Sequence, residues 1–218
     1  MPGKINYNNQ MSDILASFEQ GAKKPRLLLH VCCAPCSSAV LERLHKFFDI
    51  VLYFDNPNLD TSAEFDRRAL EAERLAKETD WADEVVIVPY DPETYLAAVK
   101  GLEGEREGGK RCSACFDLRL TRSADAAKAR GCDWFTTTLT ISPRKNAGLL
   151  NEIGHSAGER AGVPFLPSDF KKQSGFLRSI ELSRDLGLYR QDYCGCAFSR
   201  EERFAQREAQ PSASLTDK

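Results

Sequence analysis

The feature that most constrains the fold is a repeating order of short apolar run, turn and amphipathic segment. Apolar or β-branched runs occur at residues 26–31, 50–54, 84–88 and 133–140. Runs that are apolar throughout are typical of parallel strands buried on both faces. Segments with apolar residues at helical spacing follow them, and we expect helices over 61–79, 92–102, 113–130 and 147–161. This order predicts an α/β fold with a parallel sheet flanked by helices.

The length of 218 residues favours a single domain. We expect residues 1–25 to be a lead segment with a short amphipathic helix and residues 26–208 to be one catalytic α/β domain. Residue 163 begins a last short extended piece, and loop and helix continue to residue 208. Residues 209–218 are rich in Pro and Ser and predict a disordered tail.

The sequence indicates a cytoplasmic protein with no membrane partner. It has no apolar run near the roughly 20 residues that a spanning helix needs, and its polar N-terminal segment lacks the apolar centre of a signal peptide. The net charge of −2 excludes a generic DNA-coating protein, which would be strongly basic. A local basic patch remains compatible with this balance. Loop cations that could hold a phosphate-bearing substrate, or form a solvated face, are Arg144, Lys145, Lys172 and Arg190.

Eight cysteines are the strongest functional signal, because clustered cysteines in a reducing compartment indicate metal or redox chemistry. Cys32, Cys33 and Cys36 follow the first predicted strand and open a helix, whose N-terminus favours thiolates. Cys112 and Cys115 form a CxxC at the start of another helix, which is a metal half-site. These thiols suit an iron–sulfur cluster or a zinc site.

The third cysteine motif is Cys194-Gly195-Cys196. A disulfide across a single residue closes a strained ring that is easily reduced, so this pair suits redox turnover. The alternative is that both thiols are further metal ligands. Cys132 stands alone before a strand, and we expect it to be buried in the core.

Polar residues follow several predicted strands. Cys32, Asp55 and Arg144 each lie just beyond the end of a strand or in the loop that follows it. In open parallel sheets, ligands bind at the carboxyl ends of the strands. We therefore expect the cysteine turn to lie in the active site.

These motifs together resemble a known family, the epoxyqueuosine reductases of the QueH family. The resemblance runs in order from about residue 4 to residue 203. It rests on six segments: HVCCAPCS (30–37), YFDNPN (53–58), RCSACFDLR (111–119), TTTLTISPRKN (136–146), DFKK (169–172) and LYRQDYCGCAFS (188–199).

The resemblance implies the last step of queuosine biosynthesis, in which the epoxide of epoxyqueuosine in the anticodon loop of tRNA is reduced to the alkene. It implies a cobalamin-independent oxidoreductase that carries a [4Fe–4S] cluster and takes electrons from a donor of unassigned identity. The implied fold is a Rossmann-like, nucleotide α-hydrolase-like sheet with a helical and loop C-terminal extension. The implied ligands of the cluster are Cys32, Cys33, Cys112 and Cys115. Cys194 and Cys196 would be the redox-active pair, and Cys36 would be a candidate ligand of a second metal ion.

The reaction also requires protons, because the epoxide oxygen leaves as water. Candidate donors are Asp55, Asp117 and Tyr193. Two other functional classes stay open. A zinc-structured RNA-binding module would be colourless and redox-silent, and a thiol–disulfide reductase would need only one CxxC. The colour and iron content of anaerobically purified protein distinguish the three.

Overall fold

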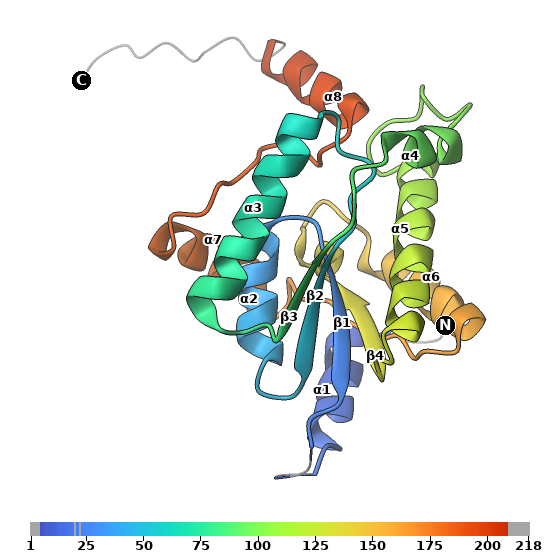
Figure 1. Cartoon of the computed structure of the whole chain (residues 1–218). Coiled ribbons are helices and arrows are strands. Elements are labelled where there is room, and N and C mark those ends of the chain that lie inside the picture. The colour runs from blue at the N-terminus through green and yellow to red at the C-terminus, as the bar shows by residue number, and fades with distance from the viewer. Residues whose placement is uncertain (1–4, 20, 22, 209–218) are drawn as a thin grey trace.

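The structure, a computed structural model, describes residues 5–19, 21 and 23–208. Its centre is a parallel sheet of four strands in the order β3-β2-β1-β4 (Figure 1). Leu28 of β1 lies opposite Val51 of β2 and Phe135 of β4. The strands are β1 (Arg26–Val31), β2 (Asp49–Phe54), β3 (Glu84–Ile87) and β4 (Trp134–Thr137). The apolar runs thus form the predicted parallel sheet.

Helices cover both faces of the sheet (Figure 1). On one face lie α2 (Ala34–Leu44), α3 (Ser62–Thr79) and α7 (Gly175–Asp185), and on the other lie α5 (Lys110–Ala129) and α6 (Ala147–Ala161). The predicted α/β class is therefore confirmed. The lead helix α1 (Tyr7–Ala16) buries Met11 and Leu15 in the same apolar cluster as α2. Residues 1–4 of the predicted lead segment and the predicted tail 209–218 lie outside the described residues.

Helix caps explain why several boundaries agree with the sequence. Thr61 accepts a hydrogen bond from the Glu64 amide (3.1 Å), and this contact starts α3. Asn146 accepts one from the Leu149 amide (3.3 Å), which starts α6. Helix α4 (Pro92–Ala98) is shorter than predicted because the chain turns at Gly101, whose φ is +82°. Helix α5 begins three residues before the predicted start, so Cys112 and Cys115 lie in its first turns.

The predicted strand 133–140 is too long. β4 ends at Thr137, and a short 3₁₀ helix follows over Thr138–Ile141. The Thr137 hydroxyl accepts a hydrogen bond from the Leu139 amide (3.1 Å), which turns the chain out of the sheet. The extended piece predicted from residue 163 pairs with β4 through a single parallel bridge between Phe135 and Phe165.

The C-terminal extension crosses the carboxyl ends of the strands. After α7 the chain runs along α3 and enters α8 (Ala197–Glu208), which lies near α4 (Figure 1). Within the described residues, none of the helices combines the length and apolar character needed to cross a membrane. The cysteine-bearing turns and loops meet at this end of the sheet.

Candidate metal and redox site

The first cysteine group is the turn between β1 and α2. The ligand atoms of Cys32, Cys33 and Cys36 lie within 4.8 Å of one another, and the Sγ atoms of Cys32 and Cys33 are 3.8 Å apart. Among the described residues, no other trio of Cys, His, Asp or Glu side chains meets this distance criterion. Pro35 lies in the first turn of α2, where its missing N–H costs nothing. The turn therefore presents three converging thiols at the helix N-terminus.

The three thiols of this group differ in pKa. Hydrogen bonds with Cys33 and Cys36 hold the pKa of Cys32 well below its ordinary value. The cations of Lys145 and Arg119 act on Cys32 in the same direction. The pKa values of Cys33 and Cys36 are raised, chiefly by their hydrogen bonds with Cys32. The group thus favours one thiolate stabilised by two neutral thiols, an arrangement suited to binding a soft metal.

The second cysteine group joins two distant segments. Cys112 and Cys115 from α5 and Cys194 and Cys196 from the loop before α8 line one small cavity. Backbone amides donate to two of the sulfurs, Gly108 to Cys112 (3.2 Å) and Ser199 to Cys196 (3.4 Å). Burial raises the pKa of Cys115 to about 12 and also raises that of Cys112. Without a metal these two thiols stay protonated.

A cavity of about 260 Å³ connects the two groups. Cys32 and Cys36 line it from the first group, and Cys194 lines both this cavity and the smaller one. The structure therefore brings all seven cysteines that the sequence singled out for metal or redox chemistry to one end of the sheet. Cys132 lies apart, just after the end of α5, and is buried in an apolar cluster.

Three arginines around these cysteines are almost fully buried, and the sequence prediction assigned none of them a role beside the cysteines. They are Arg68, Arg111 and Arg119. Arg68 pairs with Glu64, and Arg111 pairs with Glu202. Arg119 instead donates to the side-chain oxygen of the neutral Asn56, and its Nε has no hydrogen-bond partner among the described residues.

The positive charge of Arg119 lies close to the cysteine sulfurs. Burial alone would lower the pKa of Arg119, but its electrostatic attraction to the sulfurs of Cys115 and Cys32 raises it. Its position was available from the sequence, because Cys112, Cys115 and Arg119 are spaced three and four residues apart and share one face of a helix.

The candidate proton donors lie in different places. Asp55 is buried and accepts two hydrogen bonds from Arg122 (2.6 and 3.1 Å), and it lines neither cavity. Asp117 lies on the exposed face of α5 and pairs with Arg160 of α6 (3.4 Å). The structure therefore places both carboxylates away from the cysteines.

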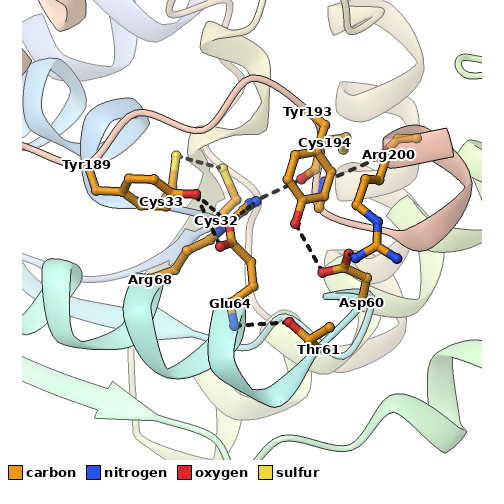
Figure 2. Close-up of polar contacts among 12 residues, drawn as sticks. Cys32, Cys33, Asp60, Thr61, Glu64, Arg68, Tyr189, Tyr193, Cys194 and Arg200 are labelled. Carbon is orange, nitrogen blue, oxygen red and sulfur yellow. Dashed lines mark hydrogen bonds and ion pairs between the residues drawn. The ribbon is translucent and has the colours of Figure 1, made fainter. Parts of the chain in front are cut away.

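Tyr193 is the candidate donor that lines the connecting cavity. Its hydroxyl donates to Asp60 (3.0 Å) (Figure 2). Burial, followed by the nearby carboxylates of Glu64 and Asp60, raises the pKa of Tyr193. The phenol therefore keeps its proton at neutral pH.

Most of the predicted substrate-binding cations surround the connecting cavity. Arg144, Lys145 and Arg190 line it, together with Arg203, which the sequence prediction did not include. Lys172 is exposed and lines a separate hollow between α2 and α7. The negative charge of nearby thiols raises the pKa of Lys145 although burial would lower it.

Comparison with known proteins identifies the family. The family model described as epoxyqueuosine reductase QueH matches residues 27–202. The chain belongs to the epoxyqueuosine reductase QueH family. The QueH protein of Staphylococcus epidermidis is 43% identical over 202 residues, which cover 90% of this chain and 85% of that protein. The QueH protein of Thermotoga maritima is 37% identical over 180 residues, covering 81% of this chain and 91% of that protein. The resemblance seen in the six sequence segments is confirmed.

A solved structure also resembles this QueH-family chain. It is the U34-tRNA thiolase NcsA from Methanococcus maripaludis with its [4Fe-4S] cluster. The TM-score is 0.53 at 14% sequence identity, covering 92% of this chain and 72% of that chain. At this identity the likeness concerns the fold, and it agrees with the predicted Rossmann-like architecture.

The donor set of this QueH-family chain fits an iron–sulfur cluster. Cysteine thiolates are the usual ligands of such clusters, and two groups of cysteines border one cavity here. The unpaired Nε of buried Arg119 and the cation of Lys145 supply positive charge where an anionic centre would lie. The residues present are therefore compatible with a bound cluster.

Proposed function

We propose that this chain reduces the epoxide of epoxyqueuosine in the anticodon loop of tRNA to the alkene of queuosine, the last step of queuosine biosynthesis. The proposed catalytic unit is residues 26–208, acting in the cytoplasm with a [4Fe–4S] cluster and without cobalamin. The observation that carries this proposal is the convergence of three cysteine segments beside a cation-lined cavity, in a chain of the QueH family.

The proposed ligands of the cluster are one pair of thiols from each group, Cys32 with Cys33 and Cys112 with Cys115. The two pairs come from helix N-terminal turns at the same end of the sheet, which supports this assignment. Cys36 lies close enough to Cys32 and Cys33 to share a second metal ion with them. When bound, the cluster would supply electrons one at a time.

Cys194 and Cys196 are proposed as the redox-active pair. Reduction of the epoxide breaks both C–O bonds, forms the C=C bond and releases the oxygen as water, so it consumes two electrons and two protons. Oxidation of a dithiol to a disulfide releases two electrons, and an external electron donor would restore the thiols. The position of Cys194 on the wall of both cavities supports this role.

Tyr193 is the proposed source of one proton. It lines the cavity, and its raised pKa keeps the hydroxyl protonated at neutral pH. Asp55 and Asp117 would need a rearrangement to reach the cavity, because each is held by an arginine. We therefore assign them structural roles.

The proposed tRNA contacts are the cations at the mouth of the cavity, Arg144, Lys145 and Arg190. Cations bind the phosphate backbone and position a nucleic acid, while the buried cavity would hold the modified base. Lys172 would extend this surface toward α7.

The test uses protein purified without oxygen. The expected result is brown protein with close to four irons and four sulfides per chain, as a [4Fe–4S] cluster requires, and conversion of tRNA-bound epoxyqueuosine to queuosine, measured by mass spectrometry of the digested tRNA. Colourless protein that contains only zinc and binds tRNA without converting it would support the RNA-binding module instead. Disulfide reduction by iron-free protein would support a thiol–disulfide reductase.

A further inference from the structure

The segment that carries the Cys194–Cys196 pair runs along α3, and two arginines of that helix hold it. Arg74 donates to the carbonyl oxygens of Leu186 (3.0 Å) and Gly187 (3.2 Å) at the start of the segment. Arg68 Nη1 donates to the carbonyl oxygen of Cys194 (3.2 Å) at its end. The two arginines make the same kind of backbone contact, but only that of Arg68 involves a cysteine of the site.

Arg68 also faces the first cysteine group. Its side chain is 1% exposed, and its Nε donates to Glu64 Oε1 (2.7 Å). Figure 2 shows the guanidinium between Glu64, the Cys32–Cys33 turn and Cys194. Burial would lower the pKa of Arg68, but its electrostatic attraction to the Cys33 sulfur and to the Glu64 carboxylate raises it. One buried cation therefore lies against both the Cys32–Cys33 turn and the Cys194 segment.

The backbone beside Arg68 has a conformation and close contacts that favour glycine at position 195. Gly195 has a φ of +130°, and a Cβ there would lie 2.5 Å from Leu59 Cδ2 and 3.1 Å from Arg68 Nη1. The Asp60 amide donates to the Gly195 carbonyl oxygen (2.9 Å). The cysteine pair thus rests directly on the guanidinium of Arg68, which explains why glycine separates the two cysteines.

We propose that Arg68 is a positioning residue, whose guanidinium fixes the Cys194–Cys196 pair against the Cys32–Cys33 turn and stabilises negative charge there. The proposal rests on the proposed function, in which these cysteines serve a metal centre. Arg68 touches the backbone carbonyl of Cys194 and acts on the thiols through position and charge. A lysine would keep the charge but lose the forked geometry that reaches Glu64 and Cys194 together.

The test compares Arg68→Gln and Arg68→Lys with the matched control Arg74→Gln. In hydrogen exchange of the anaerobic holoprotein, both Arg68 variants should exchange the amides of residues 193–196 about tenfold faster, because a buried charge-assisted hydrogen bond is lost. Arg74→Gln should speed exchange near residues 186–189 instead.

The second readout is the midpoint potential of the iron centre. Arg68→Gln should shift it to a more negative value, because a nearby positive charge favours the reduced form. Arg68→Lys and Arg74→Gln should stay close to wild type, and a purely structural role of Arg68 would not produce this difference.

An Arg68→Gln protein with unchanged potential and unchanged exchange at residues 193–196 would overturn the proposal. If Arg68→Gln does not fold, unchanged exchange in Arg68→Lys would overturn it equally. Wild-type protein without iron would count against the proposed function, whereas the exchange data would still decide whether Arg68 positions the pair.

Discussion

The guanidinium of Arg111 donates a hydrogen bond to the carboxylate of Glu202, with 2.9 Å between Nη2 and Oε1. Arg111 precedes Cys112 at the start of α5, and Glu202 lies on α8. The other carboxylate oxygen accepts from the Glu107 amide (3.0 Å). Helix α8 is therefore fastened directly to the turn that presents Cys112.

Replacing Glu202 with Gln should lower the free energy of unfolding by about 2 kcal/mol, because the buried charge of Arg111 loses its counter-ion. Urea unfolding followed by circular dichroism measures this change. The matched control is Glu181→Gln, which removes an exposed partner of Arg178 and should cost no more than about 0.5 kcal/mol. Equal effects of the two substitutions would show that the Arg111–Glu202 pair contributes no more to the free energy of unfolding than an exposed ion pair.

Cys112→Ser should lose most of the iron from anaerobically purified protein, because three remaining thiolates hold a cluster poorly. The control is Cys132→Ser, which changes a cysteine buried in the core away from the site and should keep the iron. Iron and sulfide analysis of both proteins makes the comparison. Retention of full iron in Cys112→Ser would remove Cys112 from the ligand set.

The double substitution of Cys194 and Cys196 by Ser separates a redox role from a ligand role. A redox pair predicts an intact cluster spectrum and unchanged tRNA affinity, with turnover lost. A ligand role predicts loss of metal and lower stability, since metal binding and folding are coupled. Absorption spectra and a single-turnover assay on tRNA containing epoxyqueuosine decide between them, and intact iron with full activity would exclude both roles.

Arg144→Ala should weaken tRNA binding and reduce the slope of log Kd against log salt by about one, the contribution of one phosphate contact. Arg144 is exposed and lines the cavity, so the Arg144→Ala protein should keep the iron content of the wild type. Arg160→Ala is the control, because the exposed side chain of Arg160 on α6 pairs with Asp117 of α5 and does not line the cavity. Binding titrations at several salt concentrations test this, and identical slopes for all three proteins would exclude the contact.

Apolar pattern was enough to predict the sheet. Strands β1 and β2 are buried along almost their whole length, so their sequences are apolar nearly throughout and can be recognised as buried strands. The end of β4 was missed because it depends on hydroxyl contacts. Thr137 caps the following turn, and Thr140 shares a hydrogen bond with Ser168 (3.0 Å), far along the chain. Apolar spacing contains no signal for such contacts.

The site was predicted in part for the same kind of reason. Cysteines in short motifs can be recognised from the sequence alone, and the structure brings their three segments together. Arg68 was missed because it lies on a highly charged helix, and its contact with the Cys194 backbone joins residues far apart in the sequence. Asp117 and Arg119 are both polar residues of α5, but helical geometry places Arg119 on the cysteine face and Asp117 on the opposite one.

The order of the three cysteine segments along the chain has a consequence for how the protein matures. The Cys32 turn leaves the ribosome first, the Cys112 segment follows, and the Cys194 segment emerges after both. Since the last segment docks on α3 through Arg68 and Arg74, the nascent chain can form its sheet well before its thiols are enclosed. The four proposed cluster ligands therefore exist before the segment that covers them, and a polypeptide interrupted before the Cys194 segment would leave reactive thiols open to oxidation.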